Sequence, residues 1–517
     1  MSPARRLVVV GDTLLDRDVD GTAERVCPDA PALVLTERAR VDRPGGAGLA
    51  ALLAARDDLE VVLVTGLAAD PAGTQLSRLL SSAGVSVEPL PLPGATPQKV
   101  RLHAGGRLLL RLDRGGDGQV PGPPTDRALA ALRSAAAVLV SDYGRGLTRQ
   151  PALRQALAQA GAPVVWDPHP GGAPAVPGTR LATPNEPELA TLTGRTVPAR
   201  GERGPRLAAV ARNAEELRRR WRTGAVAVTL ASDGALLCHA GPTPLVVPVA
   251  APATGDSCGA GDRFAASAAL ALARGALVSE AVEAAVAAAS AYVRAGGARG
   301  VVGGEPGPGG VADPAGPTRT AASGAEVAAG LVARVRRRGG TVVATGGCFD
   351  LLHAGHVATL EAARRLGDCL VVCVNSDASV ARLKGPDRPL MPQQDRVRLL
   401  AALGCVDAVM VFDEASPEAV LSRLQPDIWV KGGDYAGGTA TGPDLPEAEL
   451  MRAWGGQAVV VPYLDGRSTT NMIAAARDGS RGDGSRREGS RRDGSRHHGA
   501  GDRPALPDRD HRAQRGA

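Results

Sequence analysis

Aromatic residues are scarce in this chain: they make up 2% of its 517 residues, whereas hydrophobic residues make up 44%. The cores must therefore be built from alanine, valine and leucine, a composition that suits parallel α/β layers. Lysine is scarce too, since Lys99, Lys384 and Lys431 are the only three among 60 basic residues. Lys384 and Lys431 follow predicted strands, which indicates positions that need a compact ammonium group, with chance survival as the alternative.

Long apolar runs and paired cysteines are also missing. No segment is apolar for long enough to span a bilayer, and the run that begins at Leu7 meets Asp12 and Asp16 well before signal-peptide length. The seven cysteines form no CxxC pair, and their odd number does not describe a disulfide framework. We therefore expect a cytoplasmic protein with reduced thiols and no membrane partner.

The excess of basic residues is small and is partly concentrated at one end. The formal net charge is +6, and segment 478–517 contains ten arginines against seven acidic residues. The rest of the chain is close to neutral, which argues against a nucleic-acid partner. Because this segment cycles through glycine, serine and arginine, we expect a disordered, solvated tail, with binding to an acidic partner as the alternative.

The length of the chain and the order of its apolar patterns predict two α/β domains. Short apolar strands alternate with helical patterns in both halves, which predicts largely parallel, doubly wound sheets. Between the halves, 298–323 is dense in glycine and proline, as is typical of a linker, and 325–338 predicts a basic helix. The predicted division is a first domain 1–305, a linker and helix 306–338, a smaller second domain 339–477 and a tail 478–517.

The clearest site pattern is GGCFDLLHAGH at 346–356. It follows a β-branched run and precedes a helical pattern at 357–366, so it predicts a strand, a glycine turn and a helix start. Unpaired N–H groups and the positive end of the helix dipole favour anions there. His353 and His356 are separated by two small residues, so the backbone can approach a polyphosphate while both rings point at it. The alternatives are two surface histidines or half of a metal site.

Further candidate residues follow the later strands of this half. Lys384 and Arg388 are expected in a turn after the second strand, and Lys431 and Asp434 at the end of the fourth. Polar residues also open the predicted last helix: Ser468, Thr469 and Thr470.

In the first half, Asp12 and Asp16 follow a predicted strand, at the end where open α/β sheets bind ligands. They are candidate hydroxyl binders, although an aspartate after a strand more often has a turn or cap role. Gly45 and Gly46 belong to a glycine-rich turn before a predicted helix. This turn is a weak signal, because a helix start needs small residues for packing.

Asn185 and Glu188 lie three residues apart, where the pattern predicts the first turn of a helix. On such a turn the two side chains share one face. They could hold a hydrated magnesium ion, but the spacing alone favours a helix cap.

The segment 254–262, TGDSCGAGD, carries the strongest signal of the first half. Small residues at a helix start expose successive N–H groups, and Asp262 adds a carboxylate at the same point. Phosphoryl transfer to an alcohol needs donors for the charge on the transferred phosphate and an acceptor for the hydroxyl proton. The chain contains no GxxxxGK[ST] sequence, so the phosphate site is not a P-loop.

Over roughly the first three hundred residues, the order and spacing of these motifs resemble the ribokinase/PfkB family of sugar kinases. The motifs are Gly11-Asp12, Gly45-Gly46-Ala47, Ser141-Asp142-Tyr143-Gly144, Asp167-Pro168, Thr183-Pro184-Asn185 with Glu188, and Gly259-Ala260-Gly261-Asp262. The resemblance implies a ribokinase-like fold, ATP as co-substrate and Mg²⁺ as cofactor. It implies Asp262 as the catalytic base and the segment Gly259, Ala260 and Gly261 as the anion hole. It places Asn185 and Glu188 in the magnesium–ATP site, through water, and implies substrate contacts from Asp12, Asp16, Gly45, Gly46 and Asp142.

The second half resembles the HxGH nucleotidyltransferases of the cytidylyltransferase-like group. Its motifs are 346–356, 375–377, 382–385, 430–435 and 468–473, and they are most similar to the adenylyltransferase part of bifunctional heptose-phosphate enzymes, which also have the kinase first. The resemblance implies a Rossmann-like fold with His353, His356 and Lys384 as catalytic residues. It implies ATP contacts from Gly346, Phe349, Asp350, Ser468, Thr469 and Thr470, and substrate contacts from Lys431 and Asp434.

Together the two resemblances imply phosphorylation of heptose 7-phosphate at C1 and adenylyl transfer from ATP to heptose 1-phosphate. A separate phosphatase must act between the two steps, and we expect a homodimer. One alternative keeps both chemistries but changes the sugar or polyol phosphate, or uses CTP or GTP. Another makes the first half a non-catalytic sugar-phosphate sensor, because Leu49 replaces a sugar-contacting asparagine that is common in these kinases and Arg263 replaces a small residue.

Overall fold

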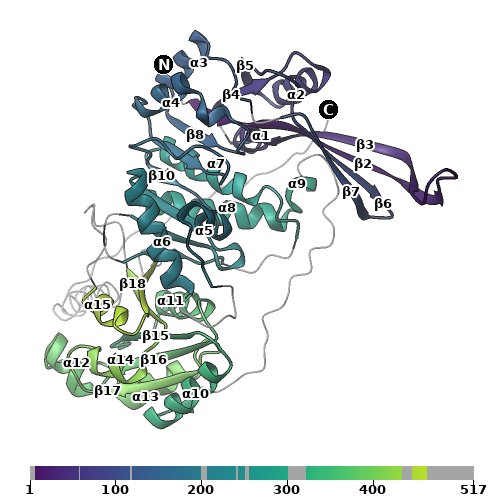
Figure 1. Ribbon diagram of the computed structural model, residues 1–517. Coiled ribbons are helices and arrows are strands. Elements are labelled where there is room, and N and C mark those ends of the chain that lie inside the picture. Colours follow the sequence, from purple (N-terminus) through teal and green to yellow (C-terminus); the bar gives the residue numbers. More distant parts are fainter. Residues whose placement is uncertain are drawn as a thin grey trace, which may run out of the picture. The chain divides into compact units, whose positions relative to one another are not determined.

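A computed structural model gives the fold of the chain (Figure 1). The structure describes residues 6–57, 59–116, 119–198, 206–239, 241, 243–250, 255–300, 322–433 and 445–462. Most of the predicted linker, the predicted tail and the predicted site residues Asp434, Ser468, Thr469 and Thr470 lie outside these ranges.

A mostly parallel sheet forms the centre of the N-terminal half, in the order β13-β12-β11-β10-β9-β8-β1-β4-β5. The first strand, β1 (Arg6–Gly11), pairs in parallel with β4 on one side and with β8 on the other. Only the pairings of β12 with β11 and β13 are antiparallel in this run of strands. The other strands are β4 (Glu60–Leu67), β5 (Val85–Pro91), β8 (Ala137–Ser141), β9 (Val164–Asp167), β10 (Leu181–Ala182), β11 (Ala225–Thr229), β12 (Ala235–Cys238) and β13 (Leu245–Val247).

Helices cover both faces of this sheet, and the alternation of side chains along β1 explains why. Leu7 and Val9 pack in one buried cluster with α1, α7 and α8, whereas Val8 and Val10 pack in another with α3, α4 and α6. Both faces are therefore apolar, as doubly wound sheets require. The helices are α1 (Ala47–Ala54), α2 (Pro71–Ser82), α3 (Asp126–Arg133), α4 (Pro151–Ala158), α5 (Glu186–Thr193), α6 (Arg206–Trp221), α7 (Ala260–Ala273), α8 (Val278–Arg294) and α9 (Gly297–Gly300), with short 3₁₀ turns η1 (Leu147–Arg149) and η2 (Ala231–Asp233).

A second, four-stranded sheet in this half has the order β3-β2-β6-β7. Its strands are β2 (Thr13–Val26), β3 (Leu33–Gly46), β6 (Gln98–Ala104) and β7 (Arg107–Arg114). Ion pairs link neighbouring strands: Arg17 donates to both Asp42 oxygens at 2.7 and 2.8 Å, and Arg43 pairs with Asp18. The sheet therefore depends on cross-strand charge pairs more than the central sheet does.

The C-terminal half contains parallel strands in the order β14-β17-β16-β15-β18-β19. Val342 and Ala344 of β15 pack with α10, α14 and α15, whereas Val343 faces α11 and α13. The strands are β14 (Ala322–Ser323), β15 (Val342–Gly347), β16 (Cys369–Asn375), β17 (Ala408–Phe412), β18 (Ile428–Gly433) and β19 (Gln457–Pro462). The helices are α10 (Ala325–Arg337), α11 (Ala354–Arg365), α12 (Asp377–Lys384), α13 (Gln393–Ala401), α14 (Glu418–Leu424) and α15 (Glu447–Arg452).

The predicted fold class of two doubly wound α/β halves is confirmed, but some local predictions were wrong. Lys384 is the last residue of α12 and does not lie in a turn after the second strand. Gly45 and Gly46 end β3 and do not form the predicted turn, and Asp16 lies inside β2, which rules out the alternative of a turn or cap role for it. Asp16, Gly45 and Gly46 were misplaced for one reason. The strands of the four-stranded sheet are rich in charged residues and contain glycine, so they lack the apolar alternation that identifies a strand.

Candidate active sites

Asp262 lies in the first turn of α7, where its carboxylate is 6% exposed. Gly259 precedes the helix with a φ of 82°, and a Cβ there would lie 2.7 Å from the Tyr292 hydroxyl and 2.8 Å from Leu49. Only glycine fits this left-handed position without strain. Burial raises the pKa of Asp262 to about 7, although the Tyr143 phenol lowers it. A carboxyl group with this pKa can accept a proton near neutral pH.

Tyr143 contacts the predicted base directly. Its hydroxyl donates to both oxygens of Asp262, at 2.9 Å each. Tyr143 belongs to a motif that carries the kinase resemblance, yet it was not among the predicted site residues. The motif gave the only signal for it, because nothing in the spacing of 143 and 262 places them together.

Asp12 and Asp142 fix the loop that carries Tyr143. Asp12 accepts hydrogen bonds from the backbone N–H groups of Tyr143, Arg145 and Leu147 at 3.2, 2.9 and 3.1 Å. Asp142 accepts from the Gly144 N–H at 2.8 Å and from the hydroxyl of a threonine in η1 at 2.9 Å. Burial raises the pKa of both carboxyl groups, that of Asp142 to about 6. Both side chains therefore shape the loop, and their sugar contacts stay predictions.

The glycine pair at the end of β3 makes room for the two predicted hydroxyl binders. A Cβ on Gly45 would lie 2.6 Å from a carboxylate oxygen of Asp16, and one on Gly46 would lie 2.4 Å from the carbonyl oxygen of Asp12. Gly46 also has a φ of 62°. Asp16 is buried and accepts from Arg101 of β6 at 3.0 Å. The glycines are therefore required by close approach at this site as well as by packing.

Asn185 and Glu188 form a capping box at the start of α5. The Glu188 N–H donates to the Asn185 side chain at 2.8 Å, and the Asn185 N–H donates to Glu188 at 2.9 Å. The cap favoured by the spacing is confirmed. Burial raises the pKa of Glu188, and burial with the charges of Glu188 and Asp262 raises the pKa of Asp167 well above its usual range.

These carboxylates determine whether the site suits a magnesium ion. Within the described ranges, no three histidine, cysteine or acidic side chains are arranged to hold a metal by themselves. Mg²⁺ often binds through one or two carboxylates, waters and substrate phosphates instead. Glu188 and Asp167, whose charges interact, supply hard oxygen donors of this kind, so the residues fit a magnesium–nucleotide complex.

A pocket of about 230 Å³ opens beside the start of α7. Gly255, Ser257, Ala260 and Gly261 form one wall of it. The remaining lining is mostly apolar and comes from the η2 region, α7 and α8: Thr229, Ala231, Ser232, Gly234, Val249, Phe264, Val286, Ala289, Ser290 and Val293. A flat apolar group could therefore lie here with its polar end toward the helix start.

The two departures from the kinase pattern have structural explanations. Arg263 points away from the base: it donates to the Leu53 carbonyl at 2.9 Å and pairs with Asp57 at 3.2 Å, at the end of α1. Leu49 is 4% exposed and packs with Leu53 and Tyr292. Neither side chain blocks Asp262, but Leu49 still offers no polar contact to a sugar, so the effect of this replacement stays open to test.

In the second half, the HxGH segment lies between β15 and α11. His353 is the residue before α11 and His356 lies in its first turn. The two rings stack with centroids 4.0 Å apart, and the Phe349 ring is 5.5 Å from that of His356. Gly346 is required because a Cβ there would lie 2.5 Å from Trp429. The structure therefore brings the predicted pair together at a helix start.

His356 is neutral at physiological pH. Burial, aided by the charges of His353 and Lys384, lowers its pKa to about 4, although the Leu351 carbonyl opposes this shift. A neutral imidazole can donate a hydrogen bond but carries no charge. Its single N–H faces the Leu351 carbonyl, so without a nucleotide His356 has neither a charge nor a second donor, and its part in charge neutralisation stays a prediction. Lys384 is exposed at the end of α12, and its positive charge acts on His356.

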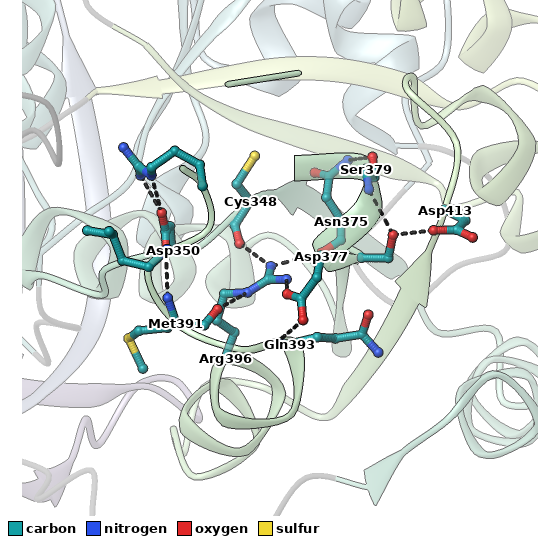
Figure 2. A network of polar contacts seen from close by, with 12 residues as sticks. Cys348, Asp350, Asn375, Asp377, Ser379, Met391, Gln393, Arg396 and Asp413 are labelled. Atoms are coloured by element: carbon teal, nitrogen blue, oxygen red, sulfur yellow. Dashed lines mark hydrogen bonds and ion pairs between the residues drawn. The ribbon is translucent and has the colours of Figure 1, made fainter. Parts of the chain in front are cut away.

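A buried arginine supports this loop (Figure 2). The fully buried Arg396 of α13 donates to the carbonyl groups of Cys348, Asn375 and Met391 at 2.5, 2.8 and 3.1 Å, and to Asp377 at 2.7 Å. It thus joins the HxGH loop to the last residue of β16 and to the last residue of segment 388–391. Nothing in the local pattern indicated this role, because Arg396 stands in a predicted helix of a chain rich in arginine.

Asp350 and Lys431 have partners of their own. Asp350 is 2% exposed, pairs with Arg388 and accepts from the N–H groups of Leu390 and Met391 at 2.7 and 3.0 Å (Figure 2). A buried carboxylate with these donors holds segment 388–391, and its predicted ATP contact remains a prediction. Lys431 forms an ion pair with the buried Glu447 at 3.0 Å.

In the part of the chain that the structure describes, no helix is long and apolar enough to cross a membrane.

Comparisons with known proteins identify the family of each half. Residues 4–302 match the family model "pfkB family carbohydrate kinase", and residues 344–456 match "Cytidylyltransferase-like". Bifunctional protein HldE of Streptomyces coelicolor is 58% identical over 477 residues, 92% of this chain and 97% of that protein. Bifunctional protein HldE of Azorhizobium caulinodans is 37% identical over 489 residues, 91% of this chain and 98% of that protein. The structure of Arabidopsis thaliana ribokinase complexed with ribose and ATP is 24% identical, with a TM-score of 0.45, and the match covers 58% of this chain and 97% of that chain. The chain therefore belongs to the family of the bifunctional protein HldE, with a pfkB carbohydrate kinase as its first part and a cytidylyltransferase-like enzyme as its second.

Proposed function

We infer that the chain is a bifunctional enzyme of ADP-heptose synthesis. It phosphorylates heptose 7-phosphate at C1 with ATP, and it transfers an adenylyl group from ATP to heptose 1-phosphate. The observation that carries this inference is the presence, on one chain, of a buried carboxylate at one helix start and an HxGH pair at another, in the order of the HldE relatives. A phosphatase that removes the 7-phosphate acts between the two steps.

In the kinase reaction, the anomeric hydroxyl attacks the γ-phosphorus of ATP and its proton passes to Asp262. The bond from that phosphorus to the β,γ-bridging oxygen breaks, and ADP leaves. The N–H groups of 259–261 stabilise the charge on the transferred phosphoryl group, and the pocket beside α7 holds the adenosine. Asn185 and Glu188 would hold Mg²⁺ through water, and the ion would supply charge neutralisation at the phosphates. The sugar is contacted by the three aspartates Asp12, Asp16 and Asp142.

In the adenylyl transfer, the phosphate of heptose 1-phosphate attacks the α-phosphorus of a second ATP, and pyrophosphate leaves. The nucleophile is already ionised, so no general base is needed. Lys384 and the stacked pair of His353 and His356 face the charge that develops at the α-phosphate. The remaining groups are assigned to the nucleotide (Gly346, Phe349, Ser468, Thr469 and Thr470) and to the sugar phosphate (Lys431 and Asp434).

We propose that the kinase domain is 1–305 and the transferase domain 339–477, joined by 306–338. Within the joining segment, Ala328 and Val332 of α10 are buried against β15, β16 and β17, so this helix belongs physically with the second sheet. We also propose a cytoplasmic homodimer. The leucines Leu108, Leu110 and Leu112 of β7 are exposed, and an exposed apolar strand of this kind is typical of an interface.

Incubation with ATP and heptose 7-phosphate, with and without an added bisphosphate phosphatase, tests the function. We expect heptose 1,7-bisphosphate without the phosphatase, and ADP-heptose with pyrophosphate when it is present, each identified by mass. Parallel reactions with CTP, GTP and other sugar phosphates test the choice of substrates. If neither heptose phosphate is converted and another sugar phosphate is turned over, that sugar phosphate replaces heptose in the assignment.

A further inference from the structure

The phenol of Tyr143 occupies the place where an acceptor hydroxyl must bind. A carboxylate base takes a proton through one of its oxygens, and the Tyr143 hydroxyl donates to both oxygens of Asp262 at 2.9 Å. In the described part of the chain, these are the only hydrogen bonds that this carboxylate accepts. Asp262 is also buried, so the phenol covers the carboxylate oxygens that a water molecule or a sugar hydroxyl would have to reach.

The main chain that carries Tyr143 is held independently of the base. Asp12 accepts the N–H groups of Tyr143 and Arg145, and Asp142 accepts the N–H of Gly144. The main chain of the loop is therefore fixed without any contribution from Asp262, so release of Asp262 requires movement of the tyrosine side chain and not of the loop.

We propose that Tyr143 guards the catalytic base: its phenol blocks water until the sugar hydroxyl displaces it. This proposal rests on the kinase function inferred above. Without such a guard, a water oxygen could form a bond to the γ-phosphorus of bound ATP while the bond to the β,γ-bridging oxygen breaks. The water proton would pass to Asp262, and ATP would be lost as ADP and phosphate without a sugar.

The charged groups around Asp262 do not replace the phenol. Asp16 from β2 and Glu188 from α5 disfavour its ionised form, and Lys99 from β6 favours it. Asp167 at the end of β9 is also coupled to it by charge. None of these side chains forms a hydrogen bond with Asp262 in the described ranges. Loss of the phenol therefore leaves the base both open to water and less readily ionised.

Tyr143→Phe tests the guard, because it keeps the ring and removes the donor. We expect ATP hydrolysis in the absence of sugar to rise by about tenfold, a gain that damage to the fold would not produce. The acid limb of bisphosphate formation should also move to higher pH, by about one unit, since the phenol favours the carboxylate form. Tyr143→Leu removes the donor as well and should show the same gain. Circular dichroism and thermal unfolding of each variant report whether the kinase half is folded, and adenylyl transfer serves as the control for the second half.

Two further variants make the result specific. Tyr292→Phe removes the other described phenol near this site, which donates to the Cys258 carbonyl at 3.0 Å and not to Asp262. It should not raise sugar-free hydrolysis. In Tyr143→Phe combined with Asp262→Asn, the extra hydrolysis should disappear, because the base is gone.

Unchanged sugar-free hydrolysis in both Tyr143 variants would overturn the proposal, as would a gain that survives Asp262→Asn. A failure of the kinase function itself looks different, because the wild-type protein would then make no bisphosphate from heptose 7-phosphate.

Discussion

Asp262 and His356 both lie in the first turn of a helix at the edge of a parallel sheet, yet their proton chemistry is opposite. Burial raises the pKa of the carboxyl group to about 7 and lowers that of the imidazole to about 4. The first group can accept a proton near neutral pH, whereas the second stays neutral. This difference matches the nucleophiles: a sugar hydroxyl must lose a proton, but a sugar phosphate is already ionised. Burial at a helix start thus serves either chemistry, depending on the side chain.

The strongest way to break this comparison is Asp262→Asn. Loss of the proton acceptor should reduce bisphosphate formation by about a hundredfold to ten-thousandfold, with ATP binding largely retained. Adenylyl transfer should continue at its normal rate. The measurement is the rate of both reactions on one preparation, with the exposed Asp29→Asn as the matched control. Bisphosphate formation at the wild-type rate would show that Asp262 is not the base.

His356→Ala tests the other side of the comparison. Removing one preorganised group beside the α-phosphate should lower adenylyl turnover by about a hundredfold to a thousandfold but weaken ATP binding by about tenfold or less. The kinase reaction should not change. The measurement compares turnover and nucleotide affinity for His353→Ala and His356→Ala. Equal losses in both quantities would mean that the rings only hold ATP, and loss of a stoichiometric zinc ion would identify them as metal ligands.

Arg396→Met tests whether the HxGH loop depends on its buried support. The variant leaves the carbonyl groups of Cys348, Asn375 and Met391 without their donor, so we expect the second half to lose about 3–5 kcal/mol of unfolding free energy. Chemical denaturation followed through adenylyl transfer measures the loss. Arg398→Met, an exposed substitution on the same helix, should have almost no effect. Equal stability of the two variants would contradict the supporting role.

The pH dependence of the two reactions should separate them. The kinase needs the ionised carboxylate, so its kcat/KM should fall by about tenfold per unit as the pH drops below the Asp262 pKa of about 7. His356 is neutral at any pH above its own pKa of about 4, so it gives adenylyl transfer no decline between about pH 5.5 and 8. Parallel acid limbs for the two reactions would show that one of these assignments is mistaken.

Cutting the chain between the halves should change the two activities least of all. Each proposed site uses residues of one half only, so fragments cut near Gly310 should both fold and each keep one activity. The second fragment must retain α10, because Ala328 and Val332 are buried against its sheet. Circular dichroism and the two assays are the measurements. Insoluble fragments, or loss of both activities, would show that the halves depend on one another.

Sequence patterns were sufficient where one periodicity dominates. The strands around β1 and β15, the helix start at Asp262 and the HxGH pair follow from apolar runs and glycine spacing, and the structure places them as expected. Lys384 was misplaced because α12 is short and carries few apolar residues. The four-stranded sheet was missed because its strands pair charges across the sheet. Tyr143 and Arg396 act through long-range contacts, which local spacing cannot reveal.

The four hydrogen bonds of Arg396 also have a consequence for local opening of the second half. They connect the HxGH loop, the end of β16 and segment 388–391 through one guanidinium group (Figure 2). Segments tied in this way exchange their amide hydrogens as one cooperative unit rather than one by one. A fluctuation that withdraws α13 would therefore release the HxGH loop, the end of β16 and segment 388–391 together.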